Sequence, residues 1–532
     1  MLGKIRNIKL PFWANLMIFL IFGSLFVLYS IRLFYIMPID SDYSNLILEA
    51  SDIISGNVLL NDWIQTGISF LTTDLLYYII AVLINGVSRN SYLVASGLMF
   101  SCMLFSTLPL IMQGEERKYK CTEWLLYLGL CTFPSIVGIN LLRAHTGVYV
   151  WIFIAVACFC QLYKGTCKKR HYILFCSSLI LGCIGDAVVV PVAVLPFLLY
   201  CVRDMLANKR MRLKRDLLLI LLTAGSAVTG SVLDKLYYVV GTADKNSFLK
   251  TKSFENFDAY ISKLNIYLHA VLGMNDADFT SSELLSVDTV FFFIKTVVVL
   301  FGFCLIVYHV YHFIRGRKWD IISEILSLGF LFVSIVFVIT TISSDILSAR
   351  YIGTCPCILA VLIIRYMRKK NVFDVRFSMN KIPVWMVANV LGIVLLFRSF
   401  IPIRELTLAE TEQERVASVL EQYELESGYA NFWDSSIITV VSRQKVKVRA
   451  VTMGDEVAIF PWGCKRSWYE EKTNFILIRD PEHVETGVTY ENALRIFKTP
   501  KQEVDFENYK ILIYDHDISD KLRNVVRERM IN

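Results

Sequence analysis

The chain has 532 residues, of which 55% are hydrophobic and only 19% carry a charge. Its mean hydropathy of +0.52 is far above that of an ordinary soluble domain, so a soluble globular protein is excluded and a polytopic membrane protein is predicted. The net charge of +7 is concentrated in short segments between apolar runs. It therefore reports membrane topology, and it gives no reason to expect nucleic-acid binding.

Apolar runs of membrane-spanning length recur along the first 403 residues. The first run, Trp13 to Ile36, is longer than the core of a cleavable signal and has no small-residue cleavage site, so it is predicted to be a retained span. We expect a mainly α, multi-pass helical bundle of about 10–12 spans in the cell membrane. The runs cover residues 13–36, 91–113, 122–142, 144–164, 172–203, 216–241, 286–314, 321–343, 350–367 and 382–403.

Basic clusters between these runs predict which loops are cytoplasmic, because lysine and arginine are retained on that side. The clusters fall within residues 4–9, 117–120, 164–170, 203–215, 315–318 and 365–370. Placing all of them inside requires residues 69–87 to be a re-entrant or interfacial segment, within a first outer loop that spans residues 38–90. It also requires residues 172–203 to form two short helices that meet at Gly185 and Asp186, and half-depth helices of this kind commonly line a water-filled cavity.

The same topology places a second outer loop at residues 242–285 and the C-terminal region, residues 404–532, outside the cytoplasm. In that region an amphipathic run, Leu406 to Leu425, precedes apolar stretches at residues 437–441, 475–478 and 511–514. Gly, Pro and charged residues separate these stretches, which predicts a small α/β or α+β domain. Four aromatic residues of this domain could be buried in its core or could stack on sugar rings. They are Trp433, Trp462, Trp468 and Tyr469.

The thirteen cysteines do not indicate a disulfide framework. Twelve lie in or beside apolar spans, and only Cys464 falls in the polar C-terminal region. Because no His/Asp set lies near the membrane cysteines, we interpret them as small packing residues and not as metal ligands.

Acidic residues gather in the first outer loop, where Leu33 to Ser88 contains six carboxylates and no lysine or arginine. Asp40 and Asp42 follow the first span directly. A carboxylate facing a half-wet cavity there can act as a general base or bind a divalent cation such as Mg²⁺ or Mn²⁺. The alternative is that both are solvated loop acids that help to orient the span.

Other ionisable residues near the outer boundary are candidates for substrate binding, because a charge at membrane depth is costly. Asp74 lies inside the re-entrant run. Arg143 and His145 are predicted at an outer turn, where a cationic pair suits a phosphate. The alternatives are a structural ion pair for Asp74 with Arg89 or Arg143, and a surface anchor at the headgroup region for the turn.

Asp186 is predicted at the tip of the short hairpin, pointing into a cavity. Arg350 and Tyr351 open an apolar span from the outer side, against the usual charge bias. A lipid phosphate is one ligand for such an arginine, and a salt bridge to Asp345 or Asp186 is the other interpretation.

Taken together, the acidic motif after the first span, the outer segment ending Gly86-Val-Ser-Arg89 and the outer C-terminal domain resemble the GT-C superfamily of integral-membrane glycosyltransferases. That superfamily includes the protein O-mannosyltransferases and the lipid A aminoarabinose transferases. The resemblance implies that Asp40 or Asp42 is the catalytic carboxylate and that Arg89 takes the place of the arginine opening the next span. The chain differs from the better-known members of this superfamily because it has no Pro-Pro-Leu-type segment after the first loop.

The functional hypothesis is a hexosyl- or pentosyltransferase of the cell envelope. It would move a sugar from a polyprenyl-phosphate or polyprenyl-diphosphate donor to a glycan, lipid or protein acceptor at the outer membrane face. Two alternatives stay open: a transporter or flippase of a lipid-linked glycan or polar solute, and a catalytically silent scaffold. In the transporter, Asp186, Asp74 and the outer arginines would line a pathway, and in the scaffold the outer domain would bind envelope partners. The enzyme requires that the outer carboxylates and arginines meet in one pocket.

Overall fold

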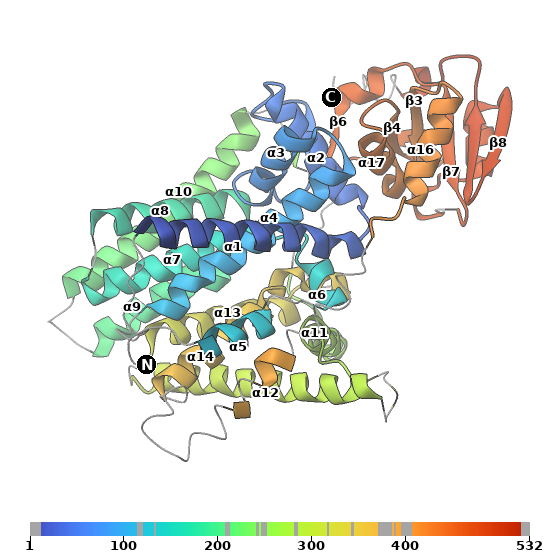
Figure 1. The fold of residues 1–532 in the computed structure, drawn as a ribbon. Helices are drawn as coiled ribbons and strands as arrows, with labels where there is room; N and C mark the ends of the chain where they lie inside the picture. Colours follow the sequence, from blue (N-terminus) through green and yellow to red (C-terminus); the bar gives the residue numbers. More distant parts are fainter. Residues whose placement is uncertain are drawn as a thin grey trace.

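A computed structural model shows a mostly helical protein (68% helix) that ends in a sheet-containing region. Figure 1 shows this region at one end of a helical bundle. The structure describes residues 12–113, 121–131, 135–166, 168–207, 213–240, 244–245, 253–280, 283, 286–316, 319–341, 345–370, 386–387, 390–394, 407–482 and 484–522.

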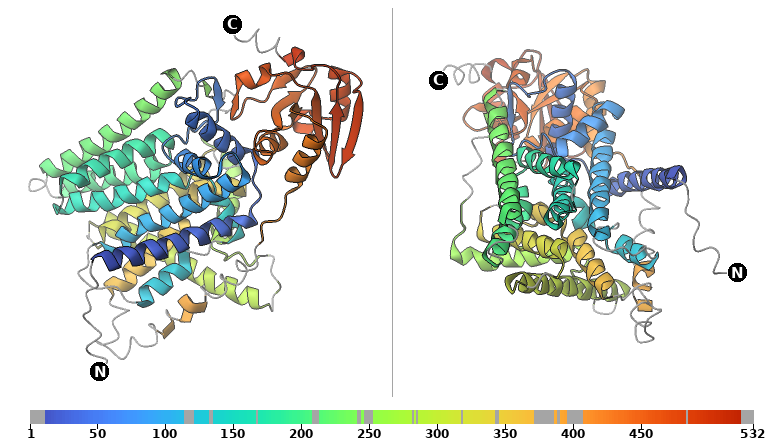
Figure 2. Two further views of the ribbon diagram at one scale, coloured as in Figure 1. Left: turned by 45° about the horizontal axis from the view of Figure 1, so that its top comes forward. Right: turned by 90° about the vertical axis from the view of Figure 1, so that its left-hand side faces the viewer.

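The bundle is built from helices of very different lengths. They are α1 (Phe12–Leu33), η2 (Phe34–Ile36), α2 (Ser41–Ile54), α3 (Asp74–Asn85), α4 (Arg89–Met112), α5 (Cys121–Cys131), α6 (Ile136–Leu141), α7 (Gly147–Lys164), α8 (Lys169–Gly185), η3 (Val190–Val194), α9 (Leu195–Ala207), α10 (Leu213–Val240), η4 (Phe257–Ala259), α11 (Tyr260–Met274), α12 (Val287–Ile314), α13 (Ile321–Ile339), η5 (Ile346–Ile352) and α14 (Cys355–Lys369). Figure 2 shows the long members lying side by side.

Within the described residues, five helices are long and apolar enough to cross a membrane: α4, α7, α10, α12 and α13. The pair η5 and α14, bent by 43°, makes a sixth if it counts as one span. Helices α10 and α12 leave most of their apolar side chains exposed, which is typical of contact with lipid. A mainly helical protein with several candidate spans is thus confirmed, whereas the count of 10–12 stays a prediction and residues 382–403 lie mostly outside the described residues.

The segment predicted to be re-entrant contains α3, which has 12 residues. At 1.5 Å per residue it is about 18 Å long, far short of the ~30 Å hydrocarbon core. The predicted break at Gly185 and Asp186 is present, because α8 ends at Gly185 and the chain re-enters helix through the π-helical turn η3, whereas half-depth helices stay a prediction. Pro191 and Pro196 lack the N–H groups that a regular α-helix would use there.

The C-terminal region contains a six-stranded mixed sheet in the order β5-β4-β3-β7-β9-β8. Strand β3 (Ser427–Ala430) is parallel to β4 (Lys447–Met453) and β7 (Phe475–Arg479). Strands β5 (Val457–Ile459), β9 (Tyr509–Ile513) and β8 (Gln502–Phe506) add antiparallel edges, and the helices are α16 (Glu412–Gln422), α17 (Phe432–Val441), α18 (Tyr490–Phe497), η8 (Arg466–Glu470) and η9 (Val484–Thr486). The prediction of strands and helices together in this region is confirmed.

A second, three-stranded sheet joins segments far apart in the sequence. Strand β1 (Trp63–Gln65) pairs with β2 (Asp244–Lys245) on one side and with β6 (Cys464–Lys465) on the other. The two predicted outer loops and the C-terminal region are thus hydrogen-bonded to one another.

Helix α2 packs on α17, and side-chain bonds reinforce this contact. The Ser41 hydroxyl donates to the carbonyl of Phe432 at 2.5 Å, and the Ser436 hydroxyl donates to Asn45 Oδ1 at 2.5 Å. Figure 1 shows α2 and α3 at the end of the bundle that carries α17 and the sheet. The C-terminal domain is therefore fixed against the acidic first loop.

Candidate functional site

A cavity of about 380 Å³ lies between the first loop, the turn before α7, η5 and the C-terminal domain. Charged, polar and aromatic side chains share its wall. It is lined by Asp42, Tyr43, Asn45, Leu46, Glu49, Thr66, Gly67, Ile68, Phe70, Ala144, His145, Thr341, Ser348, Arg350, Tyr351 and Trp462. Four of the predicted site residues, Asp42, His145, Arg350 and Tyr351, therefore converge on one pocket.

The two acids of the Asp-Ser-Asp motif have different surroundings because α2 begins between them. Asp40 is the N-cap of α2, and its carboxylate accepts from Tyr43 N at 3.3 Å. Asp42 lies in the first turn and lines the cavity, where its Oδ1 accepts from Trp462 Nε1 at 2.9 Å. Of the two predicted catalytic acids, the structure brings Asp42 to the cavity wall.

Asp40 is held outside that wall by Arg143, whose Nη2 lies 3.4 Å from its Oδ2. Burial raises the pKa of Asp40 to about 6; Arg143 opposes this rise and Asp42 adds to it. Arg143 also donates to the carbonyl of Pro38 at 2.9 Å and covers the ring of Tyr43. Because its guanidinium is committed to these protein groups, Arg143 has the contacts of a structural residue.

The turn that carries His145 has a left-handed backbone, with φ of 57° at His145 itself. Asp74 stabilises it, since its two carboxylate oxygens accept from His145 N and Gly147 N, each at 2.7 Å. A Cβ on Gly147 would lie 2.6 Å from Asp74 Oδ1, so this close approach requires glycine. Asp74 is fully buried and shapes the turn from behind the cavity wall.

The imidazole of His145 is fixed as tightly as its backbone. Its Nδ1 lies 2.5 Å from Asp186 Oδ2, and Asp186 Oδ1 accepts from Val188 N at 2.9 Å. The rings of Phe70 and Tyr351 lie 5.1 Å and 4.5 Å from the imidazole, centroid to centroid. Asp186 thus stands behind the cavity wall and orients a residue that lines it.

Arg350 projects into the cavity from the 3₁₀ helix η5, which Asp345 caps by accepting from Ser348 N at 2.9 Å. Both residues expected to pair with Arg350 are engaged elsewhere, Asp345 in this cap and Asp186 on His145. In the described part of the chain no group is hydrogen-bonded to the Arg350 guanidinium, and its Nε is buried without a partner. A guanidinium in this state is prepared to bind an anion.

Sequence reasoning missed Glu49. It is 4% exposed, lines the cavity, and has no hydrogen-bond donor among the described residues. Burial raises the pKa of Glu49 to about 8, so the carboxyl is mostly protonated at neutral pH. The spacing of Asp42, Asn45, Leu46 and Glu49 is i, i+3, i+4, i+7, which places all four on one helix face and could have identified it.

The C-terminal domain contacts one further predicted residue, Arg89, and contains another, Trp462. Arg89 lies away from the cavity, because its Nη1 donates to the carbonyl of Ala409 at 2.7 Å and to Glu414 Oε2 at 3.0 Å. Trp462 lines the cavity, whereas Tyr469 is fully buried core and Trp468 packs edge-on against Trp63. Of the four aromatic candidates, Trp462 therefore has the position from which to stack on a ligand.

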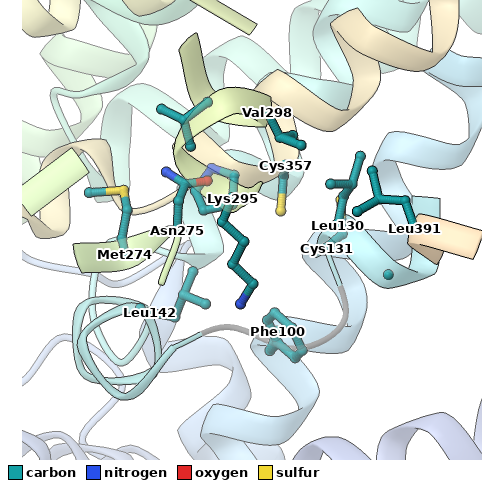
Figure 3. Close-up of a pocket in the computed structure, with 15 residues that line it drawn as sticks. Phe100, Leu130, Cys131, Leu142, Met274, Asn275, Lys295, Val298, Cys357 and Leu391 are labelled. Atoms are coloured by element: carbon teal, nitrogen blue, oxygen red, sulfur yellow. The ribbon is translucent and has the colours of Figure 1, made fainter. Parts of the chain in front are cut away.

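A second, smaller cavity of about 40 Å³ lies deeper in the bundle. Figure 3 shows Lys295 of α12 pointing toward Phe100 across this space. Its ammonium pairs with Asp276 at 2.5 Å. Eleven cysteines whose side chains the structure describes, including Cys131 and Cys357 in this wall, are free thiols. Across the described residues, no group of three or more His, Cys, Asp or Glu could hold a metal, so a divalent cation at Asp40 and Asp42 stays a prediction.

Comparison with known proteins adds no family. No protein-family model matches the chain, and none of the curated proteins matches it. The function must therefore be argued from the cavity. Chemically, the cavity combines the Asp42 carboxylate, the protonated Glu49 carboxyl, the oriented His145 imidazole and a guanidinium that has no hydrogen-bond partner in the described part of the chain.

Proposed function

We propose that the protein is an integral-membrane glycosyltransferase that moves a sugar from a polyprenyl-phosphate or polyprenyl-diphosphate donor to an acceptor hydroxyl in the outer-loop cavity. The observation that carries the proposal is that the Arg350 guanidinium, which has no hydrogen-bond partner among the described residues, lies in the same pocket as the Asp42 carboxylate. An anion site and a base side by side suit a substrate whose leaving group is a phosphate.

In the proposed reaction, the acceptor oxygen attacks C1 of the donor sugar while Asp42 takes the hydroxyl proton. The bond between C1 and the phosphate oxygen breaks, and its electron pair remains on the phosphate. Arg350 contributes most at this point, because negative charge on the departing oxygen grows in the transition state. No metal step is required of these residues.

The remaining wall suits a sugar headgroup. The cavity volume of about 380 Å³ is within the usual range for small-ligand sites. Trp462 offers a ring face beside Asp42, and the protonated Glu49 offers a hydrogen-bond donor to a sugar oxygen. The polyprenyl chain would extend along the exposed apolar helices of the bundle.

The test is transfer by the purified protein reconstituted in lipid vesicles with radiolabelled polyprenyl-phosphate sugars and polar acceptors. Asp42→Asn should lower kcat by about 100-fold or more, because the amide cannot accept the proton. Asp455→Asn is the matched control, since that carboxylate is fully exposed on the C-terminal domain. Wild-type protein that moves the labelled lipid between leaflets without forming product would instead identify a flippase.

The anion site has a separate test. Arg350→Gln should raise the donor KM and lower kcat, with a combined loss in kcat/KM of about 10- to 100-fold for one charge-assisted contact. Arg350→Lys keeps the charge but not the planar fork and should fall between the two. Equal kcat/KM for all three proteins would remove Arg350 from the site.

A further inference from the structure

His145 is held by more contacts than a packing residue needs. Its main-chain N–H is bound by Asp74, its Nδ1 by Asp186, and its ring lies between Phe70 and Tyr351. The left-handed backbone adds strain that the surrounding bonds must overcome. These restraints come from three segments, residues 70–74, Asp186 and η5, and together they fix the backbone and the ring of one histidine.

One nitrogen of the His145 ring takes no part in these contacts. Nδ1 is bound to Asp186, while Nε2 has no partner among the described residues and the side chain lines the cavity. A carboxylate on Nδ1 fixes the tautomer and stabilises the imidazolium, which prepares Nε2 to give or take a proton. A buried histidine serving only as packing would not require a free nitrogen at a cavity wall.

The cavity places His145 near the proposed phosphate site. Its ring contacts Tyr351, the residue that follows Arg350, at 4.5 Å between centroids. Tyr149 of α7 fixes that segment by donating its hydroxyl to the carbonyl of Tyr351 at 2.7 Å. The His145 imidazole and the Arg350 guanidinium therefore lie on neighbouring parts of the cavity wall.

We propose that His145 is a second catalytic residue of this cavity: its Nε2 protonates the departing phosphate oxygen, and Asp186 is its positioning residue. The inference rests on the proposed glycosyl transfer and assigns it a general acid. As the bond between C1 and oxygen breaks, the phosphate oxygen keeps the electron pair and receives the Nε2 proton. Asp186 takes no part in the proton transfer and only holds Nδ1.

The protons balance over one turnover. Asp42 gains the acceptor proton while His145 loses one to the phosphate. Transfer from Asp42 to His145 through water in the cavity restores both groups, so no external acid or oxidant is consumed. Among the described residues, the charged and titratable groups around His145 are Asp74 from α3, Asp186, Arg350 and Tyr351 from η5, and Asp42, Tyr43 and Glu49 from α2 in the same cavity wall.

The main test compares the pH dependence of kcat for wild type and His145→Asn. Asparagine tolerates the left-handed backbone and its amide can still donate to Asp186, yet it cannot transfer a proton. We expect kcat to fall about 100-fold with little change in donor KM, and the decline of kcat at rising pH to disappear. His516→Asn is the matched control, because His516 forms an exposed pair with Asp515 at 2.9 Å.

Two further variants separate catalysis from structure. His145→Gly fits the positive φ and opens space for free imidazole, which should restore transfer in a concentration-dependent way if proton donation is what was lost. Asp186→Asn should weaken and shift the pH profile while donor binding persists. A His145→Asn protein with wild-type kcat and pH profile, or a folded, donor-binding His145→Gly protein that imidazole fails to rescue, would overturn the inference. Wild-type protein with no transfer at all would overturn the proposed function itself.

Discussion

The unpaired carboxyl of Glu49 makes the stability of the protein depend on pH in a direction opposite to that of most acids. Burial raises the pKa of Glu49 from 4.5 to about 8. Between these values the folded state keeps the proton and the unfolded state has lost it. The folded state therefore binds more protons, and the free energy of unfolding must fall as pH rises from about 4.5 to about 8.

The size of this effect follows from the same two values. At about 1.4 kcal/mol per pH unit, the contribution of Glu49 reaches roughly 5 kcal/mol above pH 8, and water entering the cavity would reduce it to about 3 kcal/mol. An unfolding entropy of about 2.1 cal/mol/K per residue converts this range to about 3–5 °C for a chain of 532 residues. Glu49→Gln should therefore unfold at the same temperature as wild type at pH 5 and several degrees higher at pH 8.5.

Thermal unfolding of detergent-solubilised protein, followed by tryptophan fluorescence from pH 5 to pH 8.5, provides the assay. Asp40 also has a raised pKa, but it is present in both proteins and cancels in the difference. Glu456→Gln is the matched control, since that side chain is exposed. If wild type and Glu49→Gln lose stability in parallel as pH rises, Glu49 is hydrogen-bonded or solvated and the argument for a protonated carboxyl in the cavity fails.

Three other substitutions test separate parts of the site. Arg143→Gln should lower the free energy of unfolding by about 2 kcal/mol, because it removes charge-assisted hydrogen bonds of a buried guanidinium and the cation beside the partly exposed Asp40, and chemical denaturation in detergent measures the loss. Gly147→Ala should destabilise the protein by at least about 2 kcal/mol, because the new methyl group would lie 2.6 Å from a carboxylate oxygen. Gly225→Ala is the control, because open space surrounds that position and the substitution should be neutral or slightly stabilising. The melting temperatures of the two variants test this difference. Trp462→Phe removes the hydrogen bond to Asp42 and should lower kcat about tenfold in the transfer assay without changing the melting temperature, so equal rates would contradict a role for that bond.

Sequence alone located much of the cavity because charge near a membrane boundary is informative. Asp42, His145, Arg350 and Tyr351 were identified from their cost at that depth, and all four line one pocket. The sequence could not say which acid of the Asp-Ser-Asp pair faces the cavity. That choice depends on where α2 begins and on Arg143, which follows Asp40 by about a hundred residues.

In the C-terminal domain, sequence patterns predict some secondary-structure elements correctly but cannot show where tertiary packing outweighs local propensity. Its apolar stretch at 475–478 lies in strand β7, and the stretch at 511–514 lies in β9 except for Tyr514, as their composition favours. Residues 437–441, Ile-Ile-Thr-Val-Val, have equally high strand propensity but form the last half of helix α17. Asn431 caps that helix by accepting from Trp433 N at 2.8 Å, and packing on α2 and β4 outweighs the local preference.

The contact between the C-terminal domain and the first loop brings residues more than 400 positions apart into one cavity wall. The β1–β6 pairing and the contact between α2 and α17 bring Trp462 over the carboxylate that begins α2. Without the domain, the Asp42 carboxylate would lose the Trp462 indole and be more open to water, where a charge–charge interaction at 4 Å contributes only about 1 kcal/mol. Covering the cavity lowers the local dielectric and strengthens every interaction that the phosphate would make there. The C-terminal domain is therefore part of the active-site wall in the proposed enzyme, and weakening its contact with α2, for example by Ser436→Ala, should lower kcat/KM even though no reacting group is changed.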